Sequence, residues 1–497
     1  MKNQMPTTLA HLLAGAGSRV ISGNPDVFIS SIAVDSRRVE PGALFVCLRG
    51  TRNDGHDYAA QAVAAGAAAL LTQHDVRVDA PVAVVRSDDP LASLSPIAAT
   101  FYGRPSELLT VVGVTGTNGK TSTTHFLESI AHAAGVPYGL VGTLGARLHG
   151  RFEEVLEHTT PFAHDTQRLL ARFRDEGARG AILEVSSHAL ALHRVDDVAF
   201  DVAVFTNLTQ DHLDFHPTFE DYRSAKRVLF RLAARSRKKG VGVGVVNADD
   251  PEAEFLAREM QRCLSFAVKN PQATFRATDV QLGTQGSTFR VASLRPAPFR
   301  IRLPGPFNVS NAMAAVATAS VLDFDVEAIA EGLEAVASVP GRMTPVAAGD
   351  VGVYVDYAHT PDGLEKVLAA ARAVTKGRLI CVFGCGGDRD PLKRPLMGKI
   401  ARAMSDLAIV TSDNPRFEPP EQIIEAILTG VRASEGGAYE VVPDRAAAID
   451  RAIGTARPGD VVVIAGKGHE SYQLVRGERL PFSDVLVAQS AIARVRA

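Results

Sequence analysis

Cysteine is scarce in this sequence, and the few residues present are spread along it. Only Cys47, Cys263, Cys381 and Cys385 occur among 497 residues. Four thiols at these spacings are too few and too scattered for a disulfide framework or for a structural zinc site. We therefore expect the cysteines to be reduced.

The sequence also lacks long apolar runs. No segment approaches the roughly 18 uninterrupted apolar residues that a membrane-spanning helix needs. The N-terminal stretch MKNQMPTTLAHLLAGAGSRV has no continuous apolar region behind a basic start, which a secretory signal would have. These absences predict a cytoplasmic protein with no membrane partner.

Neither sign of charge dominates. The chain has 53 Lys and Arg residues against 55 Asp and Glu residues, a formal net charge of −2. This balance provides no general attraction to nucleic acid or to an anionic membrane. No solenoid-type repeat or low-complexity tract occurs. We expect small-molecule partners, no nucleic acid and a monomer.

The sequence does have enough apolar residues for several cores. With 46% hydrophobic and 22% charged residues, the whole chain can be globular. At about 150 residues per domain, this length predicts about three domains. From about 32 to 101, short apolar runs such as GALFVCL alternate with Ala-rich stretches, which predicts a small α/β unit.

Two longer regions alternate buried strands with helices. The first contains the apolar runs LTVVGV, RGAILEV, DVAVFTNL and GVGVGVVN. The second follows VPGRMTPV and contains VGVYVDYA, GRLICVFG, DLAIVTSD and GDVVVIAG. Such alternation favours parallel sheets covered by helices. We predict an α/β fold with a small N-terminal domain (1–107), a central domain with a mostly parallel sheet (108–340) and a C-terminal Rossmann-like domain (341–497).

The stretch VVGVTGTNGKTSTT is typical of a phosphate-binding loop. A buried strand leads into a glycine turn and then into a helix, so backbone N–H groups converge on one point and favour an anion. Lys120 is placed to reach terminal phosphates, and the Thr121 hydroxyl is placed to bind Mg²⁺. Val114 stands where the standard loop has its first glycine, so Gly116 begins a shorter GTNGKT. We therefore interpret the central domain as an ATPase domain of the P-loop type. The alternative is a glycine turn that binds nothing.

Acidic and imidazole side chains follow two later strands. ILEVSSH places Glu184 at the end of a buried strand, and TNLTQDHLDFH places Asn207 likewise, with Asp211, His212 and Asp214 after it. Ligands bind at this edge of a doubly wound sheet. A carboxylate and an imidazole there would complete a site for Mg²⁺ and phosphate. Taken singly, each residue could equally be a capping or surface residue.

A lysine occupies the apolar face of a predicted helix. Phe219, Tyr222, Lys226, Leu229 and Ala233 share one helical stripe. A lysine in such a place usually extends its ammonium to water. If Lys226 instead faced Mg²⁺ at ~5 Å, repulsion would be roughly 6 to 7 kcal/mol at an effective dielectric constant of ~20. Such a lysine must be neutralised or chemically converted.

In this order, GTNGKT, EVSSH, TNLTQDHLDFH and AKRVLF resemble the Mur ligases over almost the whole chain. The resemblance implies an ATP-dependent enzyme that adds an amino acid to the cytoplasmic peptidoglycan precursor and uses two Mg²⁺ ions. In that family the helix lysine is carbamylated by CO₂, which turns a cation into a carboxylate that binds the second Mg²⁺. The implied catalytic residues are Lys120, Glu184, His212 and Lys226, and the implied metal ligands are Thr121, Glu184, His212 and Lys226.

The resemblance also implies nucleotide contacts. NVSNAM and VPGRM resemble segments that contact ATP, and VDYAHTPDGLE resembles a strand end where an aspartate binds the ribose. The implied positions are Gly116, Thr117, Asn118, Gly119, Lys120, Thr121, Ser122, Asn311, Arg342 and Asp356. Without the resemblance, Asn308 and Asn311 could simply cap a helix, and Thr360-Pro361 begins one whatever the function.

A UDP-linked substrate is implied by two further regions. AVDSRRVEPGALFV resembles the uridine-binding edge of the N-terminal domain, while HTTP and EVSSHALALHR resemble contacts to the muramoyl peptide. The matched positions are Val34, Ser36, Thr159, Thr160, Ser186 and Arg194. The chain departs from the family pattern at His158, where Asn is usual, and at Leu192, where Gln is usual.

TSDNPRFEPP resembles the signature of the family members that add meso-diaminopimelate. The loop follows a buried strand, Pro415 fixes φ, and Arg416 can hold a carboxylate through two N–H groups. Diaminopimelate differs from lysine by one distal carboxylate, so a fixed guanidinium selects it. A lone arginine after a turn is otherwise usually solvated. The implied contacts are Arg389, Asp413, Asn414, Pro415, Arg416, Gly466 and Glu470, the last suited to the distal ammonium.

The implied reaction joins meso-diaminopimelate to the D-Glu γ-carboxylate of UDP-N-acetylmuramoyl-L-Ala-D-Glu through an acyl phosphate. Two alternatives stay open. Folylpolyglutamate synthetase has similar nucleotide and lysine motifs, but it has no use for an N-terminal uridine module or for DNPR. A regulatory P-loop ATPase would move a partner instead of making a bond.

Overall fold

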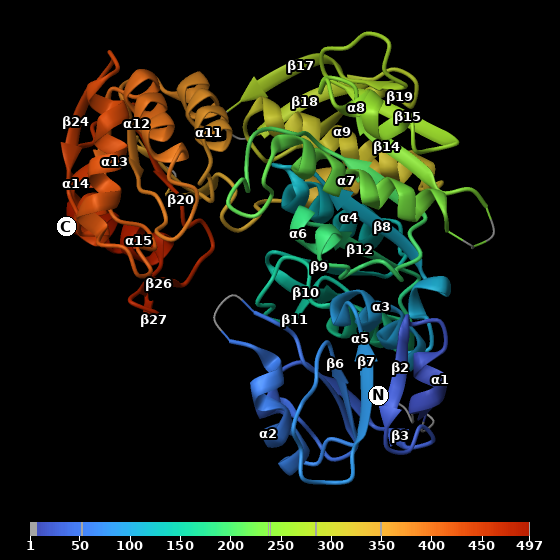
Figure 1. Ribbon diagram of the computed structural model, residues 1–497. Coiled ribbons are helices and arrows are strands. Elements are labelled where there is room, and N and C mark those ends of the chain that lie inside the picture. The colour runs from blue at the N-terminus through green and yellow to red at the C-terminus, as the bar shows by residue number, and fades with distance from the viewer. Residues whose placement is uncertain are drawn as a thin grey trace.

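The computed structural model describes residues 7–50, 53–236, 238, 240–283, 286–347 and 350–496. Its ribbon forms three α/β units in chain order, drawn from blue through green and yellow to red in Figure 1. Within the described residues, none of the helices combines the length and apolar character that crossing a membrane requires. The three-domain α/β fold expected from the sequence is thus confirmed, while the domain boundaries stay predictions.

The N-terminal unit is a small sheet with helices on its faces. Its strands lie in the order β2-β7-β6-β5-β4, with β2 antiparallel to β7 and the others parallel. Leu44 and Val85 of the sheet pack with Ile97 of α3 in one buried cluster. The elements are β1 Thr7–Thr8, α1 Leu9–Leu13, β2 Ser18–Ser22, β3 Phe28–Ile29, β4 Ser31–Ala33, β5 Ala43–Val46, α2 Ala59–Ala64, β6 Ala69–Thr72, β7 Ala83–Ser87 and α3 Pro90–Phe101.

The central unit is built on a sheet in the order β11-β10-β9-β12-β8-β13-β14-β15-β16. From β9 through β16 the neighbouring strands are parallel, and β8 lies between β12 and β13. In chain order, β9 and β12 join the sheet on one side of β8, and β13 and β14 join it later on the other side. The carboxyl end of β8 is therefore a topological switch point, where ligands bind in open α/β sheets.

Inner strands of the central sheet such as β8 and β13 are buried and largely apolar, because helices cover both faces of the sheet. Val112 and Val114 pack toward α4 and α9, whereas Val111 packs toward α5 and α7. The elements are β8 Thr110–Thr115, α4 Lys120–Ala133, β9 Tyr138–Gly142, β10 Gly145–Leu148, β11 Arg151–Glu154, α5 Ala163–Asp175, β12 Gly180–Glu184, α6 Ser187–Ala191, β13 Val202–Phe205, α7 Phe219–Ala234, β14 Val243–Asn247, α8 Ala253–Ala257, β15 Arg262–Ala267, β16 Phe275–Arg276, β17 Thr278–Gly283, β18 Gly286–Val291, β19 Arg295–Ile301, α9 Pro306–Val321 and α10 Val326–Ala335.

Antiparallel additions to this unit were not predicted. Strands β10 and β11 extend the edge of the main sheet as hairpins, and β17, β18 and β19 form a separate meander. These strands are short or half-exposed, so no continuous apolar run marks them in the sequence.

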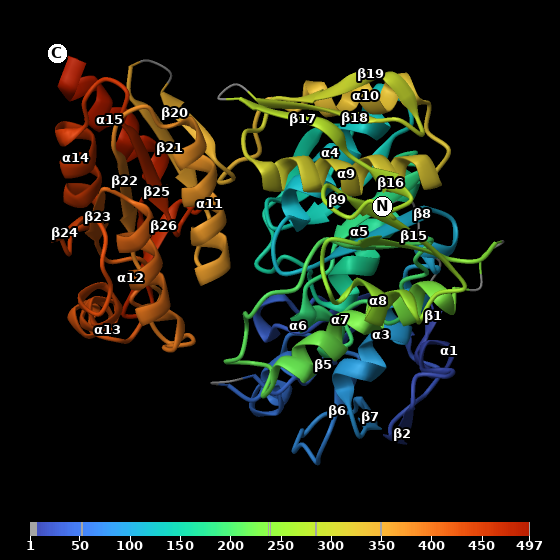
Figure 2. The ribbon, with the colours of Figure 1, turned by 90° about the horizontal axis from the view of Figure 1, so that it is seen from above.

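The C-terminal unit has the strand order β20-β21-β25-β22-β23-β24, parallel except for β20. Figures 1 and 2 show it to one side of the central unit, with α11 on the side that faces the central unit. The elements are β20 Thr344–Ala347, β21 Gly352–Asp356, α11 Pro361–Val374, β22 Leu379–Phe383, α12 Lys393–Met404, β23 Leu407–Val410, α13 Pro420–Arg432, β24 Ala438–Val441, α14 Arg445–Thr455, β25 Val461–Ala465, β26 Tyr472–Val475, β27 Glu478–Pro481 and α15 Asp484–Arg496.

Candidate active site

The glycine turn between β8 and α4 has the geometry of a phosphate-binding loop. Gly119 has φ +88° and directly precedes α4, which begins at Lys120. A Cβ at Gly116 would lie 1.9 Å from the Thr206 hydroxyl oxygen, and a Cβ at Gly119 would lie 2.2 Å from Oδ1 of Asn311. Only glycine fits both places, which explains the GTNGKT spacing.

Residues after β13 clamp this loop from the other side. The Asn118 N–H donates to Oδ1 of Asn207 at 3.0 Å, and Nδ2 of Asn207 donates back to the Asn118 carbonyl at 3.0 Å. The Thr206 hydroxyl donates to the same carbonyl at 2.6 Å. Asn207 therefore fixes the shape of the loop.

Thr121 and Glu184 meet beneath the loop. The Thr121 hydroxyl donates to Oε2 of Glu184 at 3.0 Å, and Glu184 is 0% exposed. The Thr143 N–H and hydroxyl each donate to this carboxylate at 3.0 Å. Arg342, which follows α10, donates to the Thr121 hydroxyl at 3.0 Å. Two oxygen atoms of the kind that bind Mg²⁺, from Thr121 and Glu184, thus lie close together near the start of α4.

Lys226 is buried beside the loop and does not extend to solvent. It is 2% exposed, and its Nζ donates to the Gly116 carbonyl at 3.0 Å. Lys120 donates to the same carbonyl at 2.7 Å. Nζ of Lys226 lies 4.5 Å from the centre of the Tyr222 ring. Burial, and then the charge of Lys120, hold the pKa of Lys226 well below its ordinary value.

The apolar stripe predicted on α7 is confirmed with one exception. Tyr222, Leu229 and Ala233 are buried with Lys226. Phe219, the first residue of the helix, is 39% exposed.

His212 lies in a loop after β13 and has φ +55°. Its Nε2 is 3.4 Å from Oδ2 of Asp211, and its ring meets that of His188 edge-on with centres 4.7 Å apart. Burial lowers the pKa of His212, which leaves a neutral imidazole able to bind a cation. In the described part of the chain, no hydrogen bond or ion pair joins His212 to Glu184 or Lys226.

A cavity of about 340 Å³ opens beside the loop and is lined by both larger units. Asn118, Ser122 and Asn311 line it from the central unit, and Asp356 lines it from the end of β21. Oxygens of Asp356 accept the Met343 N–H at 2.6 Å and the Ala358 N–H at 2.8 Å. Burial raises the pKa of Asp356 to about 6, opposed by the charge of Arg342.

The asparagines of α9 do not cap that helix. Gly305 precedes its first residue, whereas Asn308 and Asn311 lie inside its first two turns. Nδ2 of Asn311 donates to Oδ1 of Asn308 at 3.2 Å, and Nδ2 of Asn308 donates to the Pro304 carbonyl at 2.8 Å. Asn311 is thereby held against the phosphate loop.

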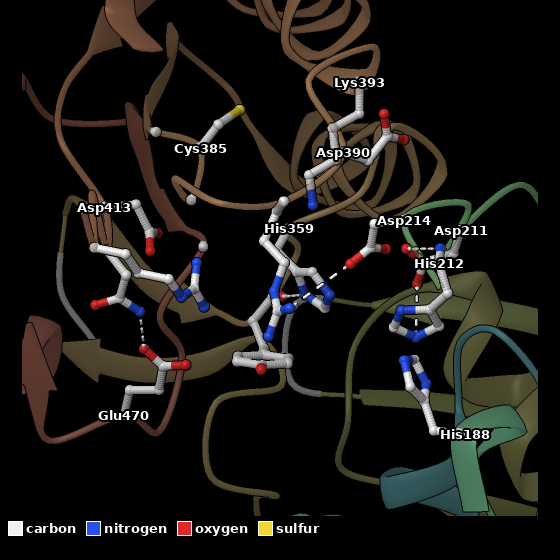
Figure 3. Close-up of a pocket in the computed structure, with 17 residues that line it drawn as sticks. His188, Asp211, His212, Asp214, His359, Cys385, Asp390, Lys393, Asp413 and Glu470 are labelled. Carbon is white, nitrogen blue, oxygen red and sulfur yellow. Dashed lines mark hydrogen bonds and ion pairs between the residues drawn. The ribbon is translucent and has the colours of Figure 1, made fainter. Parts of the chain in front are cut away.

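A second cavity, of about 190 Å³, lies between the central and C-terminal units. Figure 3 shows His188, Asp211 and His212 on one side of it and Asp413 and Glu470 on the other. Its lining includes all the predicted diaminopimelate contacts except Pro415, namely Arg389, Asp413, Asn414, Arg416, Gly466 and Glu470.

Arg416 is presented to this cavity by a strained loop. Its φ is +54°, and its N–H donates to the Leu474 carbonyl at 2.9 Å. Its side chain donates to the Gly387 carbonyl at 2.7 Å. Burial lowers the pKa of Arg416, and the neighbouring Arg389 lowers it further. Two guanidinium groups therefore share one cavity wall, a setting that favours an anion.

The structure also shows the surroundings of Pro415, in this loop, and of Gly466, in the loop beside it. Pro415 is buried behind it, and its carbonyl would lie 2.0 Å from a Cβ at Gly387. Gly466 has φ +121°, and a Cβ there would lie 2.4 Å from Oδ2 of Asp413. Close approach of the two loops thus requires glycine at 466.

The residues predicted to contact the UDP-linked substrate form two groups. Around Glu184, the Thr160 hydroxyl donates to the Glu184 carbonyl at 2.8 Å, and Arg194 donates to the Thr160 carbonyl at 2.8 Å. The Ser186 N–H donates to the Thr160 hydroxyl at 3.1 Å, and the Thr159 hydroxyl lies 3.1 Å from that of Thr143. In the N-terminal unit, Val34 is half-buried and Ser36 donates to Gln61 at 3.2 Å.

Sequence reasoning missed several residues of these cavities. His359 lines both of them, and Lys393 lines the second. Lys467 and Arg445 lie buried behind the loop that carries Arg416, where they contact Asn414 and Ser412. The AGKGHE and DYAHTPD stretches contain two of these residues, but only the fold reveals which way they point.

Three family models match consecutive parts of the chain. They are the Mur ligase family catalytic domain over residues 28–102, the Mur ligase middle domain over 114–319 and the Mur ligase glutamate ligase domain over 341–468. The chain belongs to the Mur ligase family. The phosphate loop and Lys226 of this Mur ligase fall in the middle-domain match, and Arg416 falls in the glutamate ligase domain match.

Relatives of this Mur ligase match it from end to end. A UDP-N-acetylmuramoyl-L-alanyl-D-glutamate–2,6-diaminopimelate ligase from Gloeobacter violaceus is 46% identical over 496 residues, 99% of each chain. One from Syntrophomonas wolfei is 44% identical over 484 residues, 97% of this chain and 98% of its own. A solved structure of a ligase of that name is 32% identical, covers 99% of this chain and 100% of its own, and has a TM-score of 0.66.

Proposed function

We propose that this chain ligates meso-2,6-diaminopimelate to the D-Glu γ-carboxylate of UDP-N-acetylmuramoyl-L-Ala-D-Glu at the expense of ATP, in cytoplasmic peptidoglycan precursor synthesis. The observation that carries the proposal is the cavity shared by two units. Arg416 and Glu470 line it from the C-terminal unit, and Asp211 and His212 line it from the central unit. An amino acid held by the first pair would face an acyl group beside the second.

In the first step, an oxygen of the γ-carboxylate attacks the γ-phosphorus of ATP. The bond to the β-γ bridging oxygen breaks, giving an acyl phosphate and ADP. Lys120, held at the start of α4, would neutralise charge that spreads over the transferring phosphoryl group. Asn311, Arg342 and Asp356 line the cavity expected to hold the nucleotide.

Thr121 and Glu184 fit a Mg²⁺ ion, because a hydroxyl and a carboxylate 3.0 Å apart are hard oxygen donors. A bound ion there would supply further positive charge to the phosphoryl transfer. His212 is the third proposed ligand, and its neutral imidazole suits that role. Thr121 already accepts a hydrogen bond from Arg342, so a cation would compete with that arginine.

Lys226 fits a second cation only after modification. Burial, and then the charge of Lys120, lower the pKa of its amine and so favour the neutral form, which is the form that reacts with CO₂. The nitrogen adds to the carbon of CO₂ and loses a proton, which leaves a carbamate anion. The proposed carbamate would replace the amine beside Lys120 with an anionic metal ligand.

In the second step, the amine of diaminopimelate attacks the acyl carbon and phosphate leaves. The free amine loses one of its two protons as the amide forms, and that proton goes to the departing phosphate. Arg416 and Arg389 are proposed to bind the distal carboxylate, and Glu470 is proposed to bind the distal ammonium. Because the substrates sit on different units, movement of the C-terminal unit is expected to complete the site.

The UDP-linked substrate is proposed to run from the N-terminal unit to Glu184. Val34 and Ser36 would bind its uridine end, and Arg194 would bind its peptide end. Arg194 is 8% exposed, and burial lowers its pKa to about 10. A substrate carboxylate would compensate this buried cation.

Replacing Gly119 by alanine is expected to weaken ATP binding by about tenfold or more, because the side chain strains the backbone and displaces Asn311. Gly135→Ala is the matched control. Gly135 also has positive φ, +68°, but nothing lies within 4 Å of an added Cβ. Calorimetric titration of both variants with ATP measures the difference. Equal affinities would show that the loop tolerates a side chain.

The test of the proposed function is release of phosphate from ATP by the purified chain. Release is expected only when the UDP-dipeptide and an amino acid are both present, with meso-diaminopimelate the best of a panel of diamino acids. Mass spectrometry should find the corresponding UDP-tripeptide. An ATPase indifferent to both substrates would favour a regulatory role, and glutamate transfer to a folate would favour folylpolyglutamate synthesis.

A further inference from the structure

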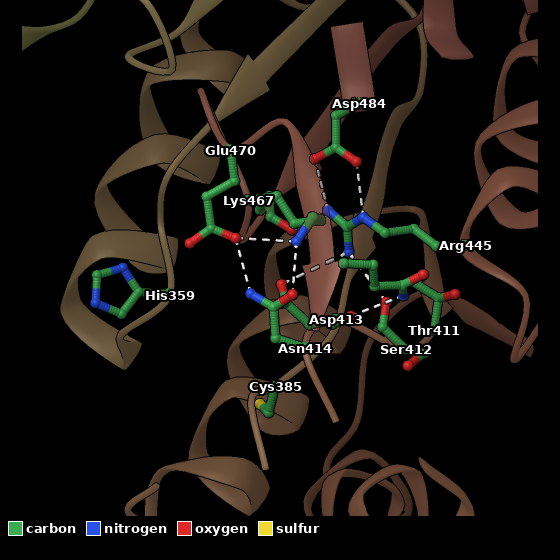
Figure 4. A network of polar contacts seen from close by, with 12 residues as sticks. His359, Cys385, Thr411, Ser412, Asp413, Asn414, Arg445, Lys467, Glu470 and Asp484 are labelled. Carbon is green, nitrogen blue, oxygen red and sulfur yellow. Dashed lines mark hydrogen bonds and ion pairs between the residues drawn. The ribbon is translucent and has the colours of Figure 1, made fainter. Parts of the chain in front are cut away.

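Lys467 is a buried cation behind the wall of the second cavity. It lies between Gly466 and Gly468 after β25 and is 0% exposed. Its Nζ donates to Oδ1 of Asn414 at 2.8 Å and to Oε2 of Glu470 at 2.9 Å (Figure 4). A buried charge persists only where such partners compensate it. Lys467 therefore connects the two loops that carry the proposed amino-acid contacts.

The contacts of Lys467 fix the orientation of the Asn414 amide. The Leu474 N–H also donates to Oδ1 of Asn414, at 2.9 Å. Both neighbours of this atom are donors only, so it must be the oxygen. Nδ2 consequently faces the cavity side, where it donates to Oε2 of Glu470 at 2.8 Å. Among the described residues, Nδ2 has no second hydrogen-bond acceptor.

The same contacts give the two oxygens of the Glu470 carboxylate different surroundings. Oε2 accepts from both Lys467 and Asn414. In the part of the chain that the structure describes, Oε1 accepts no hydrogen bond, and Glu470 lines the cavity with a side chain 17% exposed (Figure 3). The carboxylate is thus held at one oxygen and presented at the other.

Arg445 provides a contrast within the same network. It is paired with Asp484 at 2.7 Å, and both side chains are 0% exposed. Arg445 also donates to the backbone carbonyls of Ser412 and Ala465, and it lies 3.8 Å from Oδ2 of Asp413, which lines the cavity. Most contacts of Arg445 therefore stay within the protein, whereas both side-chain partners of Lys467, Asn414 and Glu470, line the cavity.

We propose that Lys467 is a positioning residue for amino-acid selection, which sets Glu470 to bind the ammonium at the distal end of the substrate. This inference rests on the proposed function. Loss of the Nζ group would free the Glu470 carboxylate to turn and would remove the charge that balances it. The variant should therefore discriminate poorly between substrates with and without a distal amine.

The experiment compares meso-diaminopimelate with 2-aminopimelate, which keeps the distal carboxylate but lacks the distal amine. For Lys467→Met, KM for meso-diaminopimelate is expected to rise and its preference in kcat/KM over 2-aminopimelate to fall by roughly tenfold or more. KM values for ATP and the UDP-dipeptide should stay unchanged. Lys399→Met is the control, because Lys399 lies exposed on α12.

A double-mutant cycle tests whether Lys467 acts through Glu470. Glu470→Gln should lose the same preference, and adding Lys467→Met to it should cost little more. Lys467→Gln, which keeps a donor without the charge, covers the case in which the methionine variant does not fold. An unchanged preference in either folded variant, independent losses in the cycle, or failure of both variants to fold would overturn the proposal. If the unmodified chain ligates no diamino acid, the proposed function fails instead.

Discussion

Lys226→Ala is expected to reduce ligation by about a thousandfold or more, which is the effect of losing charge stabilisation at a transferring group. Lys226 and Lys120 donate to one carbonyl, that of Gly116. Their mutual repulsion favours loss of one charge, and a carbamate at Lys226 would replace it with the opposite charge. The alanine variant would lack that anion, so the proposed second Mg²⁺ would bind weakly. Initial rates of ligation at saturating ATP measure the loss.

A small carboxylate should partly restore this variant. The space vacated by the buried side chain would admit acetate or formate, which would supply the missing anion. Lys399→Ala, at an exposed position, serves as the control and should keep full activity. Full activity in Lys226→Ala, or a loss that no carboxylate relieves, would contradict the assigned role.

Arg416→Asn is expected to reduce kcat/KM for meso-diaminopimelate by about a hundredfold or more, because the distal carboxylate of the substrate would lose its guanidinium partner. The value of kcat/KM for L-lysine should fall far less, so the preference for diaminopimelate over lysine should decrease. The physical reason is the pair of guanidinium groups on one wall. Burial and Arg389 lower the pKa of Arg416, and a bound distal carboxylate would offset both the burial of this charge and the repulsion from Arg389.

Arg416→Lys separates charge from geometry. It keeps one positive charge but not the planar fork, and it must adopt the positive φ of this loop. We expect diaminopimelate turnover between those of the unmodified chain and Arg416→Asn. Equal losses for diaminopimelate and lysine in Arg416→Asn would mean that the arginine only stabilises the loop.

Much of the fold could be predicted because buried parallel strands are apolar throughout. The run LTVVGV corresponds to β8, and GDVVVIAG corresponds to β25, each covered on both faces. The edge hairpin of β10 and β11 and the meander of β17 to β19 could not be predicted. Half-exposed strands such as β17 alternate too weakly to differ from loops.

The candidate site divides in the same way. The phosphate loop was predictable because glycine, lysine and hydroxyl follow a strand in a fixed order. The burial of Lys226 could be expected only from the family resemblance, because a lysine on an apolar stripe usually reaches solvent. Lys467 was missed for a related reason. A lysine between two glycines is typical of an exposed turn, yet this one is 0% exposed.

The central claim is that Lys226 carries a CO₂-derived anion next to the phosphate loop. Carbon-13 NMR of the purified chain in ¹³C-bicarbonate tests it most directly. The account predicts a protein-bound carbamate resonance that is absent from Lys226→Ala and retained in Lys399→Ala. A fully active enzyme without that resonance would contradict the claim.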